Sequence, residues 1–161
     1  MKHLNKRQFV GIVGFVDVPS DKAPAGGRGH KIVLQRTAVT ESIESLVGMG
    51  VCVKQGLDGH SASSKIGVIT KAYLLGRRIV VRGWLYHRDC VDQVAMIQAC
   101  VEPMGMSYEL ADAHVLDMRQ PVWQVSRLSF TGAAVLRQGK AAYCGTKFWM
   151  ERTEKVKQVR Q

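Results

Sequence analysis

The chain has 161 residues, 46% of them hydrophobic, and a formal net charge of +10 at pH 7. This length and composition favour one globular domain with a buried core and argue against wholesale disorder. No apolar run approaches the roughly 18 residues that a membrane span needs, and the glycine-interrupted run after the basic N-terminus is typical of a strand, not of a secretory signal. We therefore expect no membrane association.

The basic residues are spread along the chain, apart from the pair Arg77-Arg78 and the tail 151–161, in which the charge alternates in sign. The positive charge fits three surroundings equally well: nucleic acid, an acidic protein surface, or the neighbourhood of packaged DNA. No RNA-binding aromatic signature accompanies it. We expect a domain over residues 1–150 and a charged C-terminal tail over 151–161.

The chain opens with residues 8–18, which are rich in Val, Ile and Phe and predict a strand. Residues 19–31 hold two prolines and three glycines, a composition typical of a flexible surface loop. Their segment GGRGHK lacks the spacing of a phosphate-binding loop. A short strand is predicted over 32–36.

Thr40 is placed to cap a short helix over 41–47, which a glycine ends. Residues 51–53 then predict a buried strand. A polar loop rich in glycine and serine follows over 55–64 and carries His60. Loops of this composition connect strands and are common places for functional side chains.

Residues 66–70 and 78–86 predict two strands that form a hairpin or meander. Asp89 is placed to cap the next helix, which Pro103 ends. Apolar residues recur along that helix at helical spacing, and we expect them to face the core. They are Val91, Val94, Ala95, Ile97 and Val101.

Residues 106–118 and 122–130 predict two strands that turn at 119–121, and the segments 132–136 and 141–146 complete the compact part. The total is about seven or eight strands and two or three helices, with no regular alternation of strand and helix. We expect a mainly β fold with a few helices (α+β), in the form of an antiparallel closed or half-closed β-barrel.

The cysteines are not in Cys-x-x-Cys spacing, and no export signal accompanies them, so reduced thiols are expected. They are Cys52, Cys90, Cys100 and Cys144. His87-x-x-Cys90 with Cys100 nearby lacks a fourth ligand at proper spacing. We expect neither a metal nor a cofactor.

A serine and a histidine are the candidate catalytic residues. Ser107 follows a glycine where a helix gives way to a strand, and such a serine is either a turn residue or a nucleophile. The nucleophile-elbow pattern requires glycine two residues later, where this chain has Glu109. A serine hydroxyl needs a neighbouring base to become a good nucleophile, and His60 could supply it if the fold brings the two together.

Several short segments support this pairing by their order along the chain. They are 58–60 (DGH), 66–69 (IGVI), 104–110 (MGMSYEL), 112–115 (DAHV), 130–136 (FTGAAVL) and 140–143 (KAAY). Together they resemble the prohead (capsid maturation) serine proteases of tailed phages, which share their fold with the herpesvirus assembly proteases. The resemblance runs from about residue 10 to residue 146.

The resemblance implies a serine endopeptidase that cuts scaffold and capsid-protein extensions, including parts of its own chain, during capsid maturation. It implies Ser107 as the nucleophile and His60 as the general base, without a cofactor. The expected partners are the scaffold protein and the major capsid protein, with a homodimer as an alternative state and nucleic acid only as a non-specific neighbour. The expected location is the host cytoplasm, inside the viral procapsid.

The third catalytic group is left open by the sequence. Many phage relatives carry an acidic residue on the strand after the nucleophile strand, and the herpesvirus branch uses a second histidine, but residues 123–129 (WQVSRLS) contain neither. The candidates elsewhere are His114, Asp112 and Asp117, and a catalytic dyad is a further alternative. Two other functions fit as well: a catalytically inactive capsid or scaffold component that retains the barrel, and a basic nucleic-acid-binding barrel.

Overall fold

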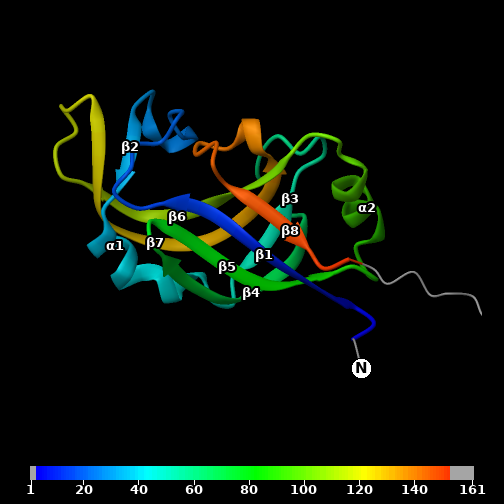
Figure 1. Ribbon diagram of the computed structural model, residues 1–161. Helices are drawn as coiled ribbons and strands as arrows, with labels where there is room; N and C mark the ends of the chain where they lie inside the picture. The colour runs from blue at the N-terminus through cyan, green and yellow to red at the C-terminus, as the bar shows by residue number, and fades with distance from the viewer. Residues whose placement is uncertain (1–2, 153–161) are drawn as a thin grey trace, which may run out of the picture.

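The computed structural model describes residues 3–152 of the chain. Within this range, eight strands form a single sheet and two α-helices, α1 (Arg36–Ser42) and α2 (Val91–Ala99), lie at opposite ends of the molecule (Figure 1). The strands are β1 (Lys6–Phe15), β2 (Lys31–Leu34), β3 (Gly50–Val53), β4 (Lys65–Leu75), β5 (Arg78–Tyr86), β6 (Met104–Val115), β7 (Val122–Arg137) and β8 (Lys147–Met150). Short 3-10 turns occupy Ala25–Gly27, Ile43–Leu46 and Gln138–Lys140.

The long strand β7 organises the sheet. The strand order is β2-β7-β3-β4-β5-β1-β8, and β6 also pairs with β7. On one side β7 pairs in parallel with β2 and then with β3, and on the other it pairs with β6 in antiparallel fashion. The sheet curls until β1 and β8 also contact β6, which gives a half-barrel.

The predicted antiparallel barrel is therefore wrong in one respect, because the sheet is mixed. The two parallel pairs join β7 to strands that lie far earlier in the chain. Parallel strands that follow one another along the chain are usually joined by a helix, so strand and helix alternate in the sequence. Parallel strands that lie far apart in the chain produce no such alternation, and the sequence therefore did not indicate them.

The first helix begins earlier than predicted. Helix α1 starts at Arg36. Thr40 does not cap it, because its hydroxyl donates a hydrogen bond to the Arg36 carbonyl inside the helix. The free backbone N–H of Arg36 is instead satisfied by Asp17, whose Oδ1 accepts it at 3.0 Å. Because this partner comes from a distant segment, local capping rules could not place the helix start.

The second helix has the predicted position but a narrower buried face. Asp89 does not cap α2; its carboxylate accepts a hydrogen bond from Asn5 Nδ2 at 2.7 Å. Val94 and Ile97 are buried, whereas Val91 and Val101 are 58% and 98% exposed, and Ala95 is also exposed. The helix lies at an end of the sheet, so one narrow stripe is enough to cover the core there.

The last third of the chain also differs from expectation. The segments 122–130 and 132–136 are one strand of 16 residues, β7, which passes through Gly132 without a break. Residues 141–146 form turns, and the unpredicted strand β8 follows them and pairs with β1. Its Phe148 is buried and stacks on Phe9 with ring centroids 5.6 Å apart.

The segment 19–31 is joined to the rest of the fold by backbone hydrogen bonds. Ser20 is buried and its N–H binds the Ile32 carbonyl, while the N–H groups of Asp21 and Lys22 both bind the Ala142 carbonyl. The mobility expected of this loop stays a prediction.

Most of the expected charged tail, residues 153–161, lies outside the described residues. In residues 3–152, no helix has the length and apolar character needed to cross a bilayer.

Candidate active site

The candidate residues come from three neighbouring parts of the sheet. Ser107 and Glu109 lie on β6, Cys52 lies on β3, and His60 lies on the loop that joins β3 to β4. Because side chains alternate along a strand, Ser107 and Glu109 project from the same face of β6. Strand β7, which pairs with both β3 and β6, holds these elements together.

Small residues on β7 leave room for the side chains of β6. Ser107 is paired with Ala134, and Glu109 is paired with Gly132. A Cβ atom on Gly132 would lie 2.9 Å from Glu109 Oε2, so glycine is needed for the carboxylate to lie there. The β6–β7 register shifts immediately after Glu109, and bulges of this kind often re-aim side chains next to active sites.

The His60 loop is fixed on both sides of the histidine. On one side Leu57 is 3% exposed, and its carbonyl accepts the N–H of Arg137 at 2.8 Å. On the other side the N–H of Ser61 contacts Cys52 Sγ at 3.5 Å. Leu57 adopts a positive φ of 56°, which turns the chain back toward the sheet. These contacts hold the imidazole over β6.

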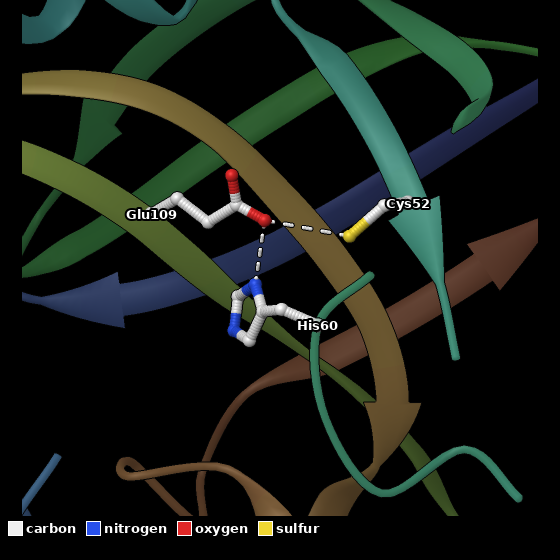
Figure 2. Close-up of side chains that lie close together, drawn as sticks. All are labelled: Cys52, His60 and Glu109. Carbon is white, nitrogen blue, oxygen red and sulfur yellow. Dashed lines mark hydrogen bonds and ion pairs between the residues drawn. The ribbon is translucent and has the colours of Figure 1, made fainter. Parts of the chain in front are cut away.

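Glu109 lies at the centre of the cluster. Its Oε1 lies 2.8 Å from His60 Nδ1 and accepts the Cys52 thiol at 3.4 Å (Figure 2). With an ionised carboxylate as its partner, Nδ1 must carry the imidazole proton, and the lone pair is then on Nε2. A carboxylate bound to Nδ1 of a histidine is the arrangement that orients the base in serine hydrolases.

The surroundings keep Glu109 ionised and Cys52 protonated. Burial is the largest influence on the Glu109 carboxyl and raises its pKa, but hydrogen bonds from His60 and Cys52 and the charges of His60 and Lys65 together bring the pKa below its ordinary value. For Cys52, burial raises the thiol pKa, and the nearby Glu109 charge adds to the effect against the hydrogen bond from Ser61. The thiol is therefore suited to donate to the carboxylate.

A cavity of about 760 Å³ contains the candidate pair. His60, Ser107 and Glu109 all line it, and their neighbours are mainly apolar. Among the described residues, no hydrogen bond joins the Ser107 hydroxyl to the His60 ring. The fold thus brings the two predicted residues into one cavity, and their catalytic roles stay predictions.

The three proposed candidates for a third group lie elsewhere. His114 is exposed, and its carbonyl accepts a hydrogen bond from Ser126. Asp117 pairs with Arg119 at 3.0 Å, which lowers the pKa of its carboxyl. Asp112 has a positive φ of 52° and lines a second cavity of about 370 Å³. In the described part of the chain, none of these side chains forms a hydrogen bond with His60.

Glu109 is the residue that the sequence reasoning missed. Its spacing from Ser107 was the available signal, since residues two apart on a strand share a face. In the sequence, Glu109 stands out only as a departure from the nucleophile-elbow pattern. That pattern belongs to a sharp turn between a strand and a helix. Ser107 lies inside a strand, where a following glycine is not required.

The same cluster has the composition of a metal site. The ligand atoms of Cys52, His60 and Glu109 all lie within 4.8 Å of one another, and no other group of three such side chains occurs in residues 3–152. The sequence-level candidates His87, Cys90 and Cys100 are accordingly not assembled into one. The prediction from the sequence that the protein binds no metal stays a prediction.

Comparison with known proteins shows a relation of fold. No family model matches the chain, and no curated protein matches it in sequence. Among solved structures, the chain is similar to the KSHV protease, a herpesvirus enzyme crystallised in complex with a hexapeptide phosphonate inhibitor, with a TM-score of 0.59 and 13% sequence identity. The match covers 91% of this chain and 66% of that chain, so this chain spans just under two thirds of the protease. The mainly β half-barrel with two helices is therefore a fold similar to that of a herpesvirus protease.

Proposed function

We propose that the protein is a serine endopeptidase of viral capsid maturation, in which Ser107 is the nucleophile and His60 the general base. The observation that carries the proposal is the hydrogen bond between His60 Nδ1 and the Glu109 carboxylate, 2.8 Å long, in a cavity that Ser107 also lines. The fold similarity to a viral protease supports the same reading. Glu109 joins the pair as a positioning residue.

The proposed chemistry follows from the protonation of the cluster. With its proton on Nδ1, His60 presents the Nε2 lone pair to the Ser107 hydroxyl, takes its proton as the serine attacks a peptide carbonyl, and later gives that proton to the leaving amine. Glu109 stabilises the imidazolium in between. Water then repeats the attack on the acyl-enzyme. The Ser107–His60 contact is expected to form when a substrate occupies the cavity, since catalytic hydrogen bonds are often loose without substrate.

The cavity lining suggests the kind of peptide that would bind. Its apolar wall includes Leu110 and Trp123, and Lys22, Arg28 and Lys140 add positive charge. An extended segment with apolar and acidic side chains would complement this lining. We propose scaffold and capsid-protein extensions of a tailed phage as the substrates, cleaved inside the procapsid, with cleavage of the protein's own chain as well.

Two measurements test the assignment. A fluorophosphonate probe should label wild-type protein at Ser107, as located by peptide mass spectrometry, and Ser107→Ala and His60→Ala should both abolish labelling. Co-expression with the scaffold and capsid proteins of the same virus should give cleavage that falls by at least about a thousandfold in either variant. Ser63→Ala, a change in the exposed part of the His60 loop, is the matched control and should retain both signals. Wild-type cleavage rates in both active-site variants would refute the proposal.

A second function is favoured by one observation. The described residues show no hydrogen bond between Ser107 and His60, and this favours a barrel that serves as a non-catalytic capsid or scaffold component. That role predicts co-purification with scaffold protein, no phosphonate labelling, and no effect of Ser107→Ala on particle assembly. Labelling at Ser107 would exclude it.

A further inference from the structure

One member of the cluster, Cys52, takes part in no chemical step of the proposed proteolysis. Cys52 is fully buried, yet its Sγ faces the Glu109 carboxylate at 3.4 Å and meets the same oxygen that His60 contacts (Figure 2). A buried cysteine is usually surrounded by apolar groups. This one instead completes a set of sulfur, nitrogen and oxygen donors whose atoms lie within 4.8 Å of one another.

The spacing of the donors suits a small tetrahedral ion. Zinc binds sulfur at about 2.3 Å and nitrogen or oxygen at about 2.0–2.2 Å, which places the ligand atoms of one site roughly 3.3–3.8 Å apart. The contacts from Glu109 Oε1 are 2.8 Å to His60 and 3.4 Å to Cys52. The second distance has the spacing of a zinc site and the first is shorter, so side-chain adjustments would bring the three atoms to that spacing.

Access and selectivity point the same way. The side chains of His60 and Glu109 are 33% and 25% exposed and line the cavity, so an ion could enter from there and keep a water molecule as its fourth ligand. A thiolate with an imidazole selects zinc-like ions over Mg²⁺ or Ca²⁺, which prefer sets of oxygen ligands. Three protein ligands with one open position is also a common zinc coordination.

We propose that Cys52, His60 and Glu109 bind a zinc-class divalent cation and that this binding blocks the general base of the active site. The binding site stands on its own geometry. The inhibitory effect rests on the proposed function, since it concerns the proton that His60 would accept from Ser107.

The inhibition follows from the coupling between Nδ1 and Nε2 of the His60 ring, since only one of them can carry the proton of a neutral imidazole. A cation bound at Nδ1 occupies the lone pair there, so the ring proton must lie on Nε2, and Nε2 can no longer accept a proton from Ser107. The Cys52 thiol proton is released to solvent as the thiolate binds, one proton for each ion. The carboxylate of Glu109 exchanges its two hydrogen bonds for a metal bond.

The binding test uses Ser107→Ala protein, so that it does not depend on catalysis. Titration with Zn²⁺ against a chromogenic chelator should show one site, and Co²⁺ in its place should give a thiolate-to-cobalt charge-transfer absorption. Cys52→Ser in this background should weaken Zn²⁺ binding more than about 100-fold, beyond the cost of losing an outer-shell partner, and abolish that absorption. Cys144→Ser, which removes an exposed thiol, is the matched control and should change neither. Circular dichroism confirms that each variant is folded.

The inhibition test uses the wild-type protein and its Cys52→Ser and Cys144→Ser variants. For each protein, the rate with Zn²⁺ is compared with the rate of the same protein in a chelating buffer. Zn²⁺ should suppress cleavage or phosphonate labelling in wild type and in Cys144→Ser, and leave the Cys52→Ser rate unchanged. Zn²⁺ binding to Ser107→Ala that survives Cys52→Ser would overturn the site. Binding without inhibition would overturn the proton-blocking step. If the protein binds Zn²⁺ but shows no cleavage or labelling, the proteolytic function is refuted and the metal site remains supported.

Discussion

At the scale of single residues, the site depends on one carboxylate that serves two neighbours. Glu109 holds the His60 ring through Nδ1 and accepts the Cys52 thiol with the same oxygen. Its pKa lies below the ordinary value, so the charge that fixes the imidazole tautomer is present at neutral pH. The orientation of the proposed base is therefore set by β6, the strand that also carries Ser107.

Replacing the Glu109 carboxylate should impair His60 as a base while the other side chains of the site stay in place. In Glu109→Gln, the amide can donate to Nδ1 and favour the wrong tautomer, so kcat/KM for peptide cleavage should fall by about 10²- to 10⁴-fold with little change in KM. Nitrogen-15 NMR of the histidine should show the ring proton moving from Nδ1 to Nε2. Glu109→Asp should restore part of the rate, and Glu102→Gln, at an exposed ion pair, is the control. An unchanged tautomer together with an unchanged rate would refute the positioning role.

At the scale of elements, β4 and β5 approach each other closely at a glycine of β5. Gly83 of β5 is paired with Ile69, next to a register shift in β4. A Cβ atom on Gly83 would lie 1.9 Å from the Val68 carbonyl oxygen, which is far shorter than any non-bonded contact between a carbon and an oxygen atom. Glycine within a strand often marks such a close backbone approach.

A methyl group at this position should therefore disturb the sheet. We expect Gly83→Ala to lower the free energy of unfolding by about 1–3 kcal/mol or more, as overpacking does elsewhere. Urea denaturation followed by tryptophan fluorescence measures it. Gly26→Ala is the matched control, since a Cβ there meets nothing within 4 Å, and it should change the midpoint little. Equal midpoints for the two variants would contradict the packing argument.

At the scale of the whole molecule, the half-barrel is held by a core that lies directly against β6, the strand that carries Ser107. Phe130 of β7 is 2% exposed, and Tyr108, the neighbour of Ser107, meets its ring edge-on with centroids 5.7 Å apart. Met106, on the other side of Ser107, is fully buried and lies against Gly11 of β1. The residues that flank Ser107 thus join β6 to both sides of the curled sheet.

Loss of this packing should affect stability and site together. Phe130→Ala should cost about 3–5 kcal/mol of folding free energy, the range for large buried aromatics, and should also reduce labelling at Ser107 because β6 loses its support. Trp149→Ala removes an aromatic that is 48% exposed on β8 and should cost less than about 1 kcal/mol. Thermal and urea unfolding of the two variants would provide the comparison. A mild effect of Phe130→Ala would show that the core can close over the gap.

The sequence by itself determined the features that rest on local pattern. The strands at 51–53 and 78–86, the loop that carries His60, and the strand that carries Ser107 follow from alternation and from turn-forming residues, which act over a few neighbours. Only the tertiary structure decided the parallel partners of β7, the start of α1 at Arg36, whose N–H binds Asp17, and the choice of Glu109 as the partner of His60. Each of these depends on which distant segments meet when the sheet curls, and no local pattern encodes that meeting.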